Sequence, residues 1–197
     1  MRKNKVILTI ALSLVLLSAC SLTDNAEKEN NPEQENEVVN KSYETKFSLD
    51  GINYRLPVKY ETLEKNGWEV NTDIDMDLEP NTYVGKKFLR KGSYIIEVMF
   101  YNNTDSKIPM KDAMIAQIGS ENREFGGDIP TDLTLKEGIN LDSTIQDVIS
   151  VYGEYTLSEG EVYDTYTFEH DKSAKLQVKY DKAEQYIRWL IITDFKE

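Results

Sequence analysis

Eight short segments of the chain are rich in apolar residues, and in several of them apolar and polar residues alternate; runs of this kind predict β-strands. The segments of the first half are Thr45–Leu49, Tyr83–Leu89, Tyr94–Tyr101 and Ala113–Ile118. Those of the second half are Leu133–Leu135, Val162–Glu169, Lys175–Tyr180 and Tyr186–Thr193. Residues that favour turns, such as Asp50-Gly51 and Lys91-Gly92, separate several of these segments. The pattern therefore predicts antiparallel sheet along much of the chain.

Two further segments carry apolar residues at helical spacing. In the first, Leu56, Tyr60 and Leu63 fall at positions i, i+4 and i+7, which places them on one face of a helix. Pro57 suits the first position of a helix, and Asn66-Gly67 supplies a left-handed stop. The sequence predicts a helix that opens at Leu56-Pro57 and ends before Asn66.

The second predicted helix precedes Gly153, which is expected to end it. Ser143 and Gln146 have the spacing of a capping box, which predicts where the helix begins. The apolar face of this helix consists of Ile145, Val148, Ile149 and Tyr152. The spacing of these residues matches that of a helix packed on a core.

Residues 51–67 and 138–153 both open with Gly-Ile-Asn, continue as a predicted helix and close with glycine. One predicted strand precedes each segment and three follow it, which indicates an internal duplication. The expected fold class is therefore α+β, with two tandem units, each a helix packed on an antiparallel β-meander. The units would be residues 45–125 and 126–197, with the seam at Gly126–Pro130. The alternative is that two short α+β segments look alike by chance.

The first 20 residues have the features of a secretory signal that ends in a lipid-attachment site. Basic residues precede an apolar segment of 12 residues, Val6–Leu17, whereas a span across a bilayer needs about 20 residues. Leu17-Ser18-Ala19-Cys20 matches the bacterial lipobox pattern. We expect residues 1–19 to be a lipoprotein signal peptide and Cys20 to carry acyl chains such as palmitate.

Residues 20–44 contain few large apolar side chains and many charges, so we expect a disordered acidic tether after the lipidated cysteine. The formal net charge of the chain is −12. Such acidity argues against nucleic-acid binding, which needs Lys and Arg to neutralise phosphates. It argues equally against electrostatic docking on an anionic membrane. We therefore expect the chain to bind the membrane through its lipid anchor alone, at the extracytoplasmic face of the cell membrane.

The lipobox, the acidic spacer, the capped segment 138–153 and the phrase YRLPVKYETLEKNGWEV (54–70) resemble surface lipoproteins of low-GC Gram-positive bacteria. The tandem order of helix and meander also resembles the β-lactamase-inhibitor protein. It is similar as well to small lipoproteins attached to outer-membrane barrel-assembly machinery. The resemblance implies a fold that binds other proteins on a concave antiparallel sheet and carries no catalytic group. No functional residue can be transferred to this chain from the fold resemblance, because the resemblance rests only on the order of helices and strands.

Candidate catalytic chemistry is sparse. The chain has one histidine, His170, which lies in a polar segment between two predicted strands and is expected to be an exposed turn residue. With one histidine and one cysteine, zinc, copper and haem sites lack ligands. The phosphate-binding glycine motifs and the G-x-S-x-G elbow are absent from the sequence. We therefore expect no enzyme, although a carboxylate pair of the glycosidase kind remains an alternative.

The densest acidic patch of the folded part contains Asp73, Asp75 and Asp77, followed by Glu79. Alternating short carboxylates can converge on a calcium ion. The pattern departs from an EF-hand because Leu78 stands where glycine is needed and Val84 stands in the twelfth position. We expect a solvated loop and no cofactor, with these three aspartates as the candidates should Ca²⁺ bind.

Aromatic residues suggest a partner-binding surface, because the chain has 12 tyrosines and 2 tryptophans. Alternation along the last strand predicts that Ile187, Trp189 and Ile191 lie on one face and Tyr186, Arg188, Leu190 and Ile192 on the other. One face of the sheet must cover the helix. An exposed second face would have the composition of a binding hot spot. The candidate partner-binding residues are Tyr166, Tyr186, Arg188 and Trp189. The alternative is that these rings pack on the helix or the neighbouring repeat.

These observations favour a membrane-anchored binding or accessory module that engages another envelope protein or a wall component. A small carboxylate-dependent hydrolase of wall glycans is the rival from a second class. An ion- or solute-binding lipoprotein is a third alternative.

Overall fold

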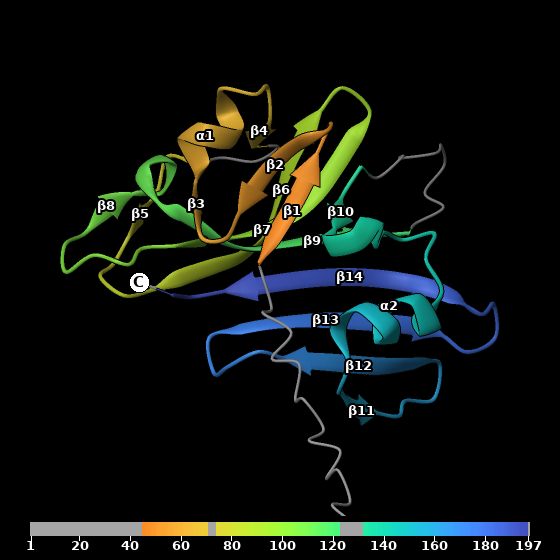
Figure 1. Ribbon diagram of the computed structural model, residues 1–197. Coiled ribbons are helices and arrows are strands. Elements are labelled where there is room, and N and C mark those ends of the chain that lie inside the picture. Colours follow the sequence, from red (N-terminus) through yellow and green to blue (C-terminus); the bar gives the residue numbers. More distant parts are fainter. Residues whose placement is uncertain (1–44, 71–73, 123–131, 197) are drawn as a thin grey trace, which may run out of the picture. The chain divides into compact units, whose positions relative to one another are not determined.

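The computed structural model describes residues 45–70, 74–122 and 132–196, which belong to one unit, Val39–Glu197. The expected signal peptide, Cys20, the tether and the seam at Gly126–Pro130 lie outside the described residues. This part of the chain is mostly antiparallel β-sheet with two α-helices, so the expected α+β class is confirmed in its broad form. In chain order the elements are β1 (Lys46–Leu49), β2 (Ile52–Arg55), β3 (Val58–Lys59), α1 (Tyr60–Glu64), β4 (Glu69–Val70), β5 (Asp77–Leu78), β6 (Tyr83–Lys91), β7 (Tyr94–Tyr101), β8 (Ile108–Pro109), η1 (Met110–Asp112), β9 (Met114–Glu121), β10 (Thr134–Leu135), η2 (Lys136–Gly138), α2 (Ile145–Tyr152), β11 (Thr156–Ser158), β12 (Tyr163–Glu169), β13 (Ala174–Asp181) and β14 (Tyr186–Asp194) (Figure 1).

A nine-stranded sheet organises the fold. Its strand order is β11-β12-β13-β14-β9-β7-β6-β4, and β3 pairs with β9 beyond the end of the β14 ladder. The strands from the two halves of the chain meet where β14 pairs antiparallel with β9 (Figure 1). There Ile192 lies opposite Ile118 and Leu190 lies opposite Ser120. A small sheet, β10-β1-β2, and the pair β5-β8 complete the strand pairing of the described residues.

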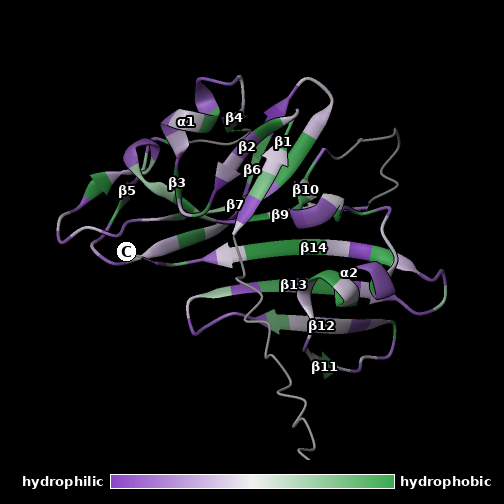
Figure 2. Ribbon diagram, viewed as in Figure 1, coloured by the Kyte–Doolittle hydropathy of each residue, from purple (hydrophilic) through white to green (hydrophobic). Residues whose placement is uncertain are grey.

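The core lies against one face of the nine-stranded sheet. In β7, Ile96, Val98 and Phe100 are buried, whereas the residues between them are half-exposed. The same alternation is found in β13, and Figure 2 shows hydrophobic residues along the long strands with hydrophilic residues in the connecting loops. Alternation of this kind indicates a sheet that is packed on one side only.

Both helices pack on this buried face. Tyr60 of α1 contacts Phe100, with ring centroids 5.5 Å apart, and Tyr152 of α2 lies 5.8 Å from Phe168. Successive cross-strand pairs lead from Phe168 to Val98, so these two residues lie on the same face of the sheet. Val98 and Phe100 share a face of β7, and both helices therefore pack on one side. We call this side the covered face. Its central side chains are Tyr166, Phe168, Leu176, Val178, Leu190, Ile192, Ile118 and Val98.

The second helix agrees with the sequence pattern except at its cap. Its range is Ile145–Tyr152, Gly153 follows at φ 83°, and Ile145 and Val148 are buried. The N-cap is Thr144 rather than Ser143. The Thr144 hydroxyl accepts from the Asp147 backbone N–H at 3.2 Å, and the Asp147 carboxylate accepts from the Thr144 N–H at 2.8 Å. Aspartate can close this reciprocal pair as glutamate or glutamine does, which moves the cap by one residue.

The expected helix start at Leu56-Pro57 is wrong. Residues 52–55 form β2 and pair with β1 across the turn at Asp50-Gly51, while Val58 and Lys59 pair with β9. These backbone groups are therefore used in sheets, and α1 begins only at Tyr60. Leu56, Tyr60 and Leu63 are nevertheless buried, so the spacing identified core positions correctly while assigning them to one long helix. Gly67 has the left-handed conformation expected of a stop, with φ 85°.

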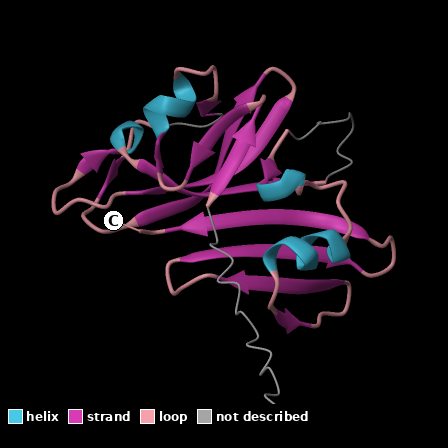
Figure 3. Ribbon diagram, viewed as in Figure 1, coloured by secondary structure: helices cyan, strands magenta, loops and turns pink. Residues whose placement is uncertain are grey.

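The eight expected strands are all present, with ends that differ by a few residues. The short strands β2, β3, β4, β5, β8 and β11 were not expected. Each has two to four residues, too few for a pattern of its own to identify it, and is defined by its pairing with another strand (Figure 3). The ends of the described fold are also joined, because the Thr45 hydroxyl donates to the Asp194 carboxylate at 2.8 Å and both residues are buried.

A buried asparagine holds the loops at one end of the sheet. Asn102 is fully buried after β7, and its side-chain amide donates to the carbonyl oxygens of Leu78, Glu79 and Ser106 at 2.7 to 3.1 Å. Its side-chain oxygen accepts from the Thr104 backbone N–H at 2.9 Å. Asn102 thus satisfies polar groups of two loops that have few regular hydrogen bonds of their own.

We expect Asn102→Ala to lower the free energy of unfolding by about 2–4 kcal/mol, because it removes the amide hydrogen bonds to three carbonyl oxygens and leaves a cavity at a fully buried position. Asn103→Ala is the matched control, since Asn103 is exposed, and should change stability by less than about 0.5 kcal/mol. Urea unfolding followed by tryptophan fluorescence measures both. Equal effects of the two substitutions would contradict this role for Asn102.

Candidate functional site

The nine-stranded sheet has a second face, which carries the side chains that alternate with core residues along each strand. We call it the open face, because the described helices and the small sheet pack on the other side. Cross-strand pairs place the following residues on it: Phe88, Glu97, Met99, Gln117, Gly119, Glu121, Thr165, Thr167, Lys175, Gln177, Lys179, Trp189 and Ile191. Most are half-exposed. The face mixes aromatic, aliphatic, amide and charged side chains.

Trp189 is the largest of these side chains. It lies opposite Lys179 in the ladder between β13 and β14, and the Lys179 ammonium nitrogen is 4.4 Å from the centroid of the indole ring. On the other side, Trp189 pairs with Glu121 of β9. A lysine over an indole ring gains cation–π attraction. The arrangement fixes a wide apolar surface between a cation and a carboxylate.

A β-bulge determines which residues of β14 reach the open face. The register pairs Lys179 with Trp189 but the next residue, Tyr180, with Ile187, so Arg188 is an extra residue in β14. Ile187 is therefore buried on the covered face, and the prediction that it shares a face with Trp189 is wrong. Trp189 and Ile191 do share a face, as predicted.

Tyr186 and Arg188 lie close together beside this bulge. An Arg188 guanidinium N–H donates to the Tyr186 hydroxyl oxygen at 2.7 Å, and Arg188 Nε is 3.6 Å from the Glu121 carboxylate. Burial alone would lower the pKa of Arg188, but Tyr186 and Glu121 outweigh it and raise the pKa. With Asn122 and Glu184, these two residues line a surface hollow of about 500 Å³.

Tyr166 lies on the other side of the sheet from Trp189. It is opposite Val178 in the ladder between β12 and β13, and Val178 is a buried core residue. Burial raises the pKa of the Tyr166 hydroxyl, with Asp164 adding to the increase. The four candidate partner-binding residues therefore do not form one surface: Trp189 is on the open face, Tyr186 and Arg188 are at its margin, and Tyr166 belongs to the covered side.

In the acidic segment, Asp77 and Glu79 both lie near a lysine, Lys107. Lys107 Nζ lies 3.0 Å from the Glu79 carboxylate and 3.9 Å from that of Asp77, so two of these groups share one lysine. Asp73 lies outside the described residues. Within residues 45–70, 74–122 and 132–196, the structure contains no group of three or more His, Cys, Asp or Glu that could hold a metal ion.

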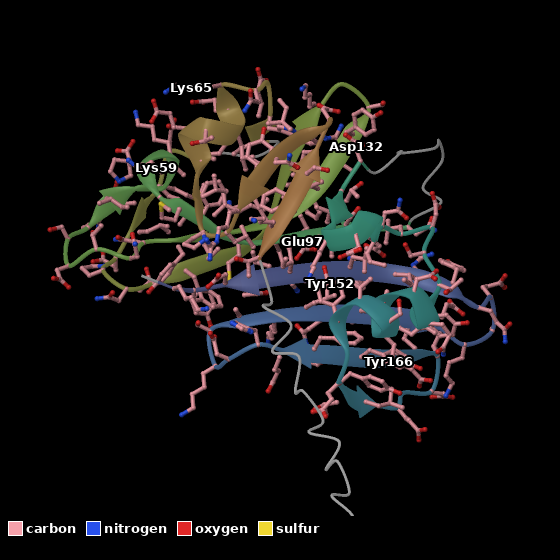
Figure 4. All side chains as sticks on the ribbon, in the orientation of Figure 1. Lys59, Lys65, Glu97, Asp132, Tyr152 and Tyr166 are labelled. Carbon is pink, nitrogen blue, oxygen red and sulfur yellow. The ribbon has the colours of Figure 1, made fainter. Side chains whose placement is uncertain are left out.

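His170 lies exposed in the turn between β12 and β13, as expected, with its backbone N–H donating to the Ala174 carbonyl at 3.0 Å. The turn after β1 contains a second group of polar contacts, around Asp50. There the Asp132 carboxylate accepts a hydrogen bond from the Asp50 backbone N–H, and Lys91 Nζ lies 2.5 Å from the Asp50 carboxylate (Figure 4). These contacts tie the turn to β6 and to residue 132.

Sequence reasoning found Trp189 but missed Lys179, Glu121 and Gln177 around it. Strand alternation alone places Lys179 and Gln177 on one face of β13. It does not say which residue of β14 lies beside them, because that depends on the bulge at Arg188. The sequence held one signal for the contact between Lys179 and Trp189, because these two residues lie on consecutive predicted strands.

Comparison of the chain with protein-family models, with curated proteins and with solved structures found no match. None of the helices in the described part is long and apolar enough to cross a membrane.

Fluorescence should distinguish Trp189 from Trp68, the other tryptophan, which is fully buried. We expect Trp189→Phe to remove most of the emission that iodide can quench, whereas Trp68→Phe should retain it. Because Lys179 holds a positive charge over the Trp189 ring, iodide should quench more strongly than caesium. Quenching that is unchanged in Trp189→Phe would contradict the half-exposed position of this ring.

Proposed function

We propose that this chain is a lipid-anchored lipoprotein on the extracytoplasmic face of the cell membrane, acting as a non-catalytic binding or accessory module for another envelope protein. The anchor proposal is supported by the basic and apolar start of the chain and by Leu17-Ser18-Ala19-Cys20. The acidic residues 20–44 would separate the folded part from the membrane as a tether.

The binding proposal rests on one observation, the position of Trp189 on the open face. The core of the fold is built on the covered face, so the fold itself does not need an indole ring on the opposite side. A large apolar side chain that stays partly in water is more informative than a buried one. Trp and Arg are enriched among residues that contribute most to protein–protein affinity.

The surroundings of Trp189 also suit a protein partner. Lys179 and Glu121 lie opposite Trp189 on the two neighbouring strands, and Gln177 lies on the same face opposite Ile191, so this face carries groups that donate and accept hydrogen bonds. An apolar centre with a polar rim is the usual composition of protein interfaces. Tyr186 and Arg188 would extend the interface at the margin of the sheet.

The finer fold proposal is a duplication, with residues 45–125 and 126–197 as tandem units. In its support, α1 precedes β4, β6, β7 and β9, and α2 precedes β11, β12, β13 and β14. The last strands of the two runs are neighbours, and the first strands form the two ends of the strand order. A helix-plus-meander repeat related by a two-fold axis between β9 and β14 would have this order.

If Cys20 is the lipid-attachment site, Cys20→Ala should abolish incorporation of labelled palmitate and release the chain from the membrane fraction. The physical reason is that the acyl chains alone provide stable attachment. Ser21→Ala is the control and should keep both labelling and membrane association. Labelling that persists in Cys20→Ala would reject this anchor.

Full-length chain immobilised in non-ionic detergent should retain a saturable protein from a solubilised envelope fraction. We expect Trp189→Ala to weaken that retention at least tenfold, the loss of about 1.4 kcal/mol or more that a hot-spot residue gives. Ile52→Ala should leave it unchanged, because Ile52 is exposed on the small sheet. Equal retention by wild type and Trp189→Ala would reject the open face as the binding surface.

A further inference from the structure

The strand β11 forms one end of the nine-stranded sheet. It pairs with β12 on one side, where Leu157 lies opposite Tyr166, and on its other side the described part of the chain places no strand. All three residues of β11 are exposed. A strand in this position leaves backbone N–H and C=O groups directed away from the sheet, ready to pair with another strand.

Exposed apolar side chains gather at this edge. Among the described residues, six large apolar side chains are exposed, and three of them are Tyr155 (43%), Leu157 (40%) and Val162 (52%). The Tyr155 ring lies 5.1 Å from that of Tyr166 and 5.7 Å from that of Phe168. The edge is therefore apolar on the side of the sheet that faces α2.

Leu157 is the surface end of a row of core side chains. Leu157 pairs with Tyr166, Tyr166 with Val178, and Val178 with Leu190. Val178 and Leu190 are fully buried, whereas Leu157 is 40% exposed. One more strand beside β11 would add an apolar side chain to this row and cover Leu157.

Of the usual protections of an edge strand, β11 has only its short length. Natural edges are protected by lysine, proline, a bulge or an inward-pointing charge. The segment Tyr155–Ser158 has neither lysine nor proline, and its register with β12 is regular. Its short length is the one feature that limits pairing.

The charges beside the edge select the kind of strand that fits. Glu154, Glu159 and Glu161 are exposed on either side of β11. Lys182 is already engaged, because it donates to the Gly160 carbonyl at 2.8 Å and lies 3.6 Å from Asp164. A second copy of this chain paired antiparallel through β11 would bring the same glutamates together, which is unfavourable.

We propose that the edge of β11 binds, by strand addition, an extended segment of a partner protein with apolar side chains at alternate positions and Lys or Arg at both ends. Main-chain hydrogen bonds to β11 would supply affinity, and the Tyr155–Leu157 surface would select the apolar side chains. The basic ends would pair with Glu154 on one side and with Glu159 and Glu161 on the other. This surface is separate from the open face and stands independently of Trp189.

The test uses a fluorescent peptide, Lys-Lys-Thr-Val-Thr-Ile-Thr-Val-Lys-Lys, and the full-length chain in non-ionic detergent. Fluorescence anisotropy at low salt should show saturable binding, and amides 156–158 should exchange hydrogen more slowly in the complex. Leu157→Gln should raise the dissociation constant at least fivefold. Ile52→Gln is the matched control, because Ile52 is 39% exposed on the edge strand β2, and should change it less than twofold.

Two altered peptides separate strand pairing from charge attraction. Replacing the central isoleucine by proline removes a backbone donor and should abolish binding, while glutamates in place of the end lysines should weaken it severalfold. Equal binding of the proline peptide, equal binding by Leu157→Gln, or no saturable binding to wild type would overturn the proposal. A dimer that forms without peptide and is lost in Leu157→Gln would also overturn it, since the edge would then serve a second copy.

Discussion

Backbone pairing between β9 and β14 determines how the two halves of the chain combine. It places Ile118 opposite Ile192 and therefore puts the core side chains of both halves on one face. The strands approach closely at Gly119, where an added Cβ would lie 3.3 Å from the Leu190 carbonyl oxygen. A shift of this register by one residue would send every side chain of one half to the opposite face. The location of the helices, the core and the open face all follow from this pairing.

A sheet with all its cover on one side has a second face whose composition is free of packing constraints. On that face the chain carries Trp189 beside Lys179 and Glu121, whereas the covered face in the same strands carries aliphatic side chains. The edge at β11 is a different kind of surface, because its backbone groups rather than its side chains alone are available. The molecule thus has two surfaces of different chemistry: a mixed aromatic and charged face, and a strand edge that has no neighbouring strand among the described residues.

Local pattern was sufficient for the long strands and for α2, since their alternation or helical spacing is continuous over several residues. It failed where a distant partner decides the conformation. Residues 52–59 pair with β1 and β9, which the spacing of Leu56, Tyr60 and Leu63 could not indicate. The bulge at Arg188 likewise depends on the fit between β13 and β14, so Trp189 was identified while its neighbours and the face of Ile187 were not.

The contact between Thr45 and Asp194 joins the first described residue of the fold to the end of its last strand. Thr45 is also tied to the β2 side of the small sheet, because its carbonyl accepts from the Leu56 N–H at 3.0 Å. Tension applied through the preceding residues would therefore load the small sheet and β14 together instead of peeling β1 away alone. A fold whose first and last described strands share such a junction is suited to resist force applied at its N-terminal end.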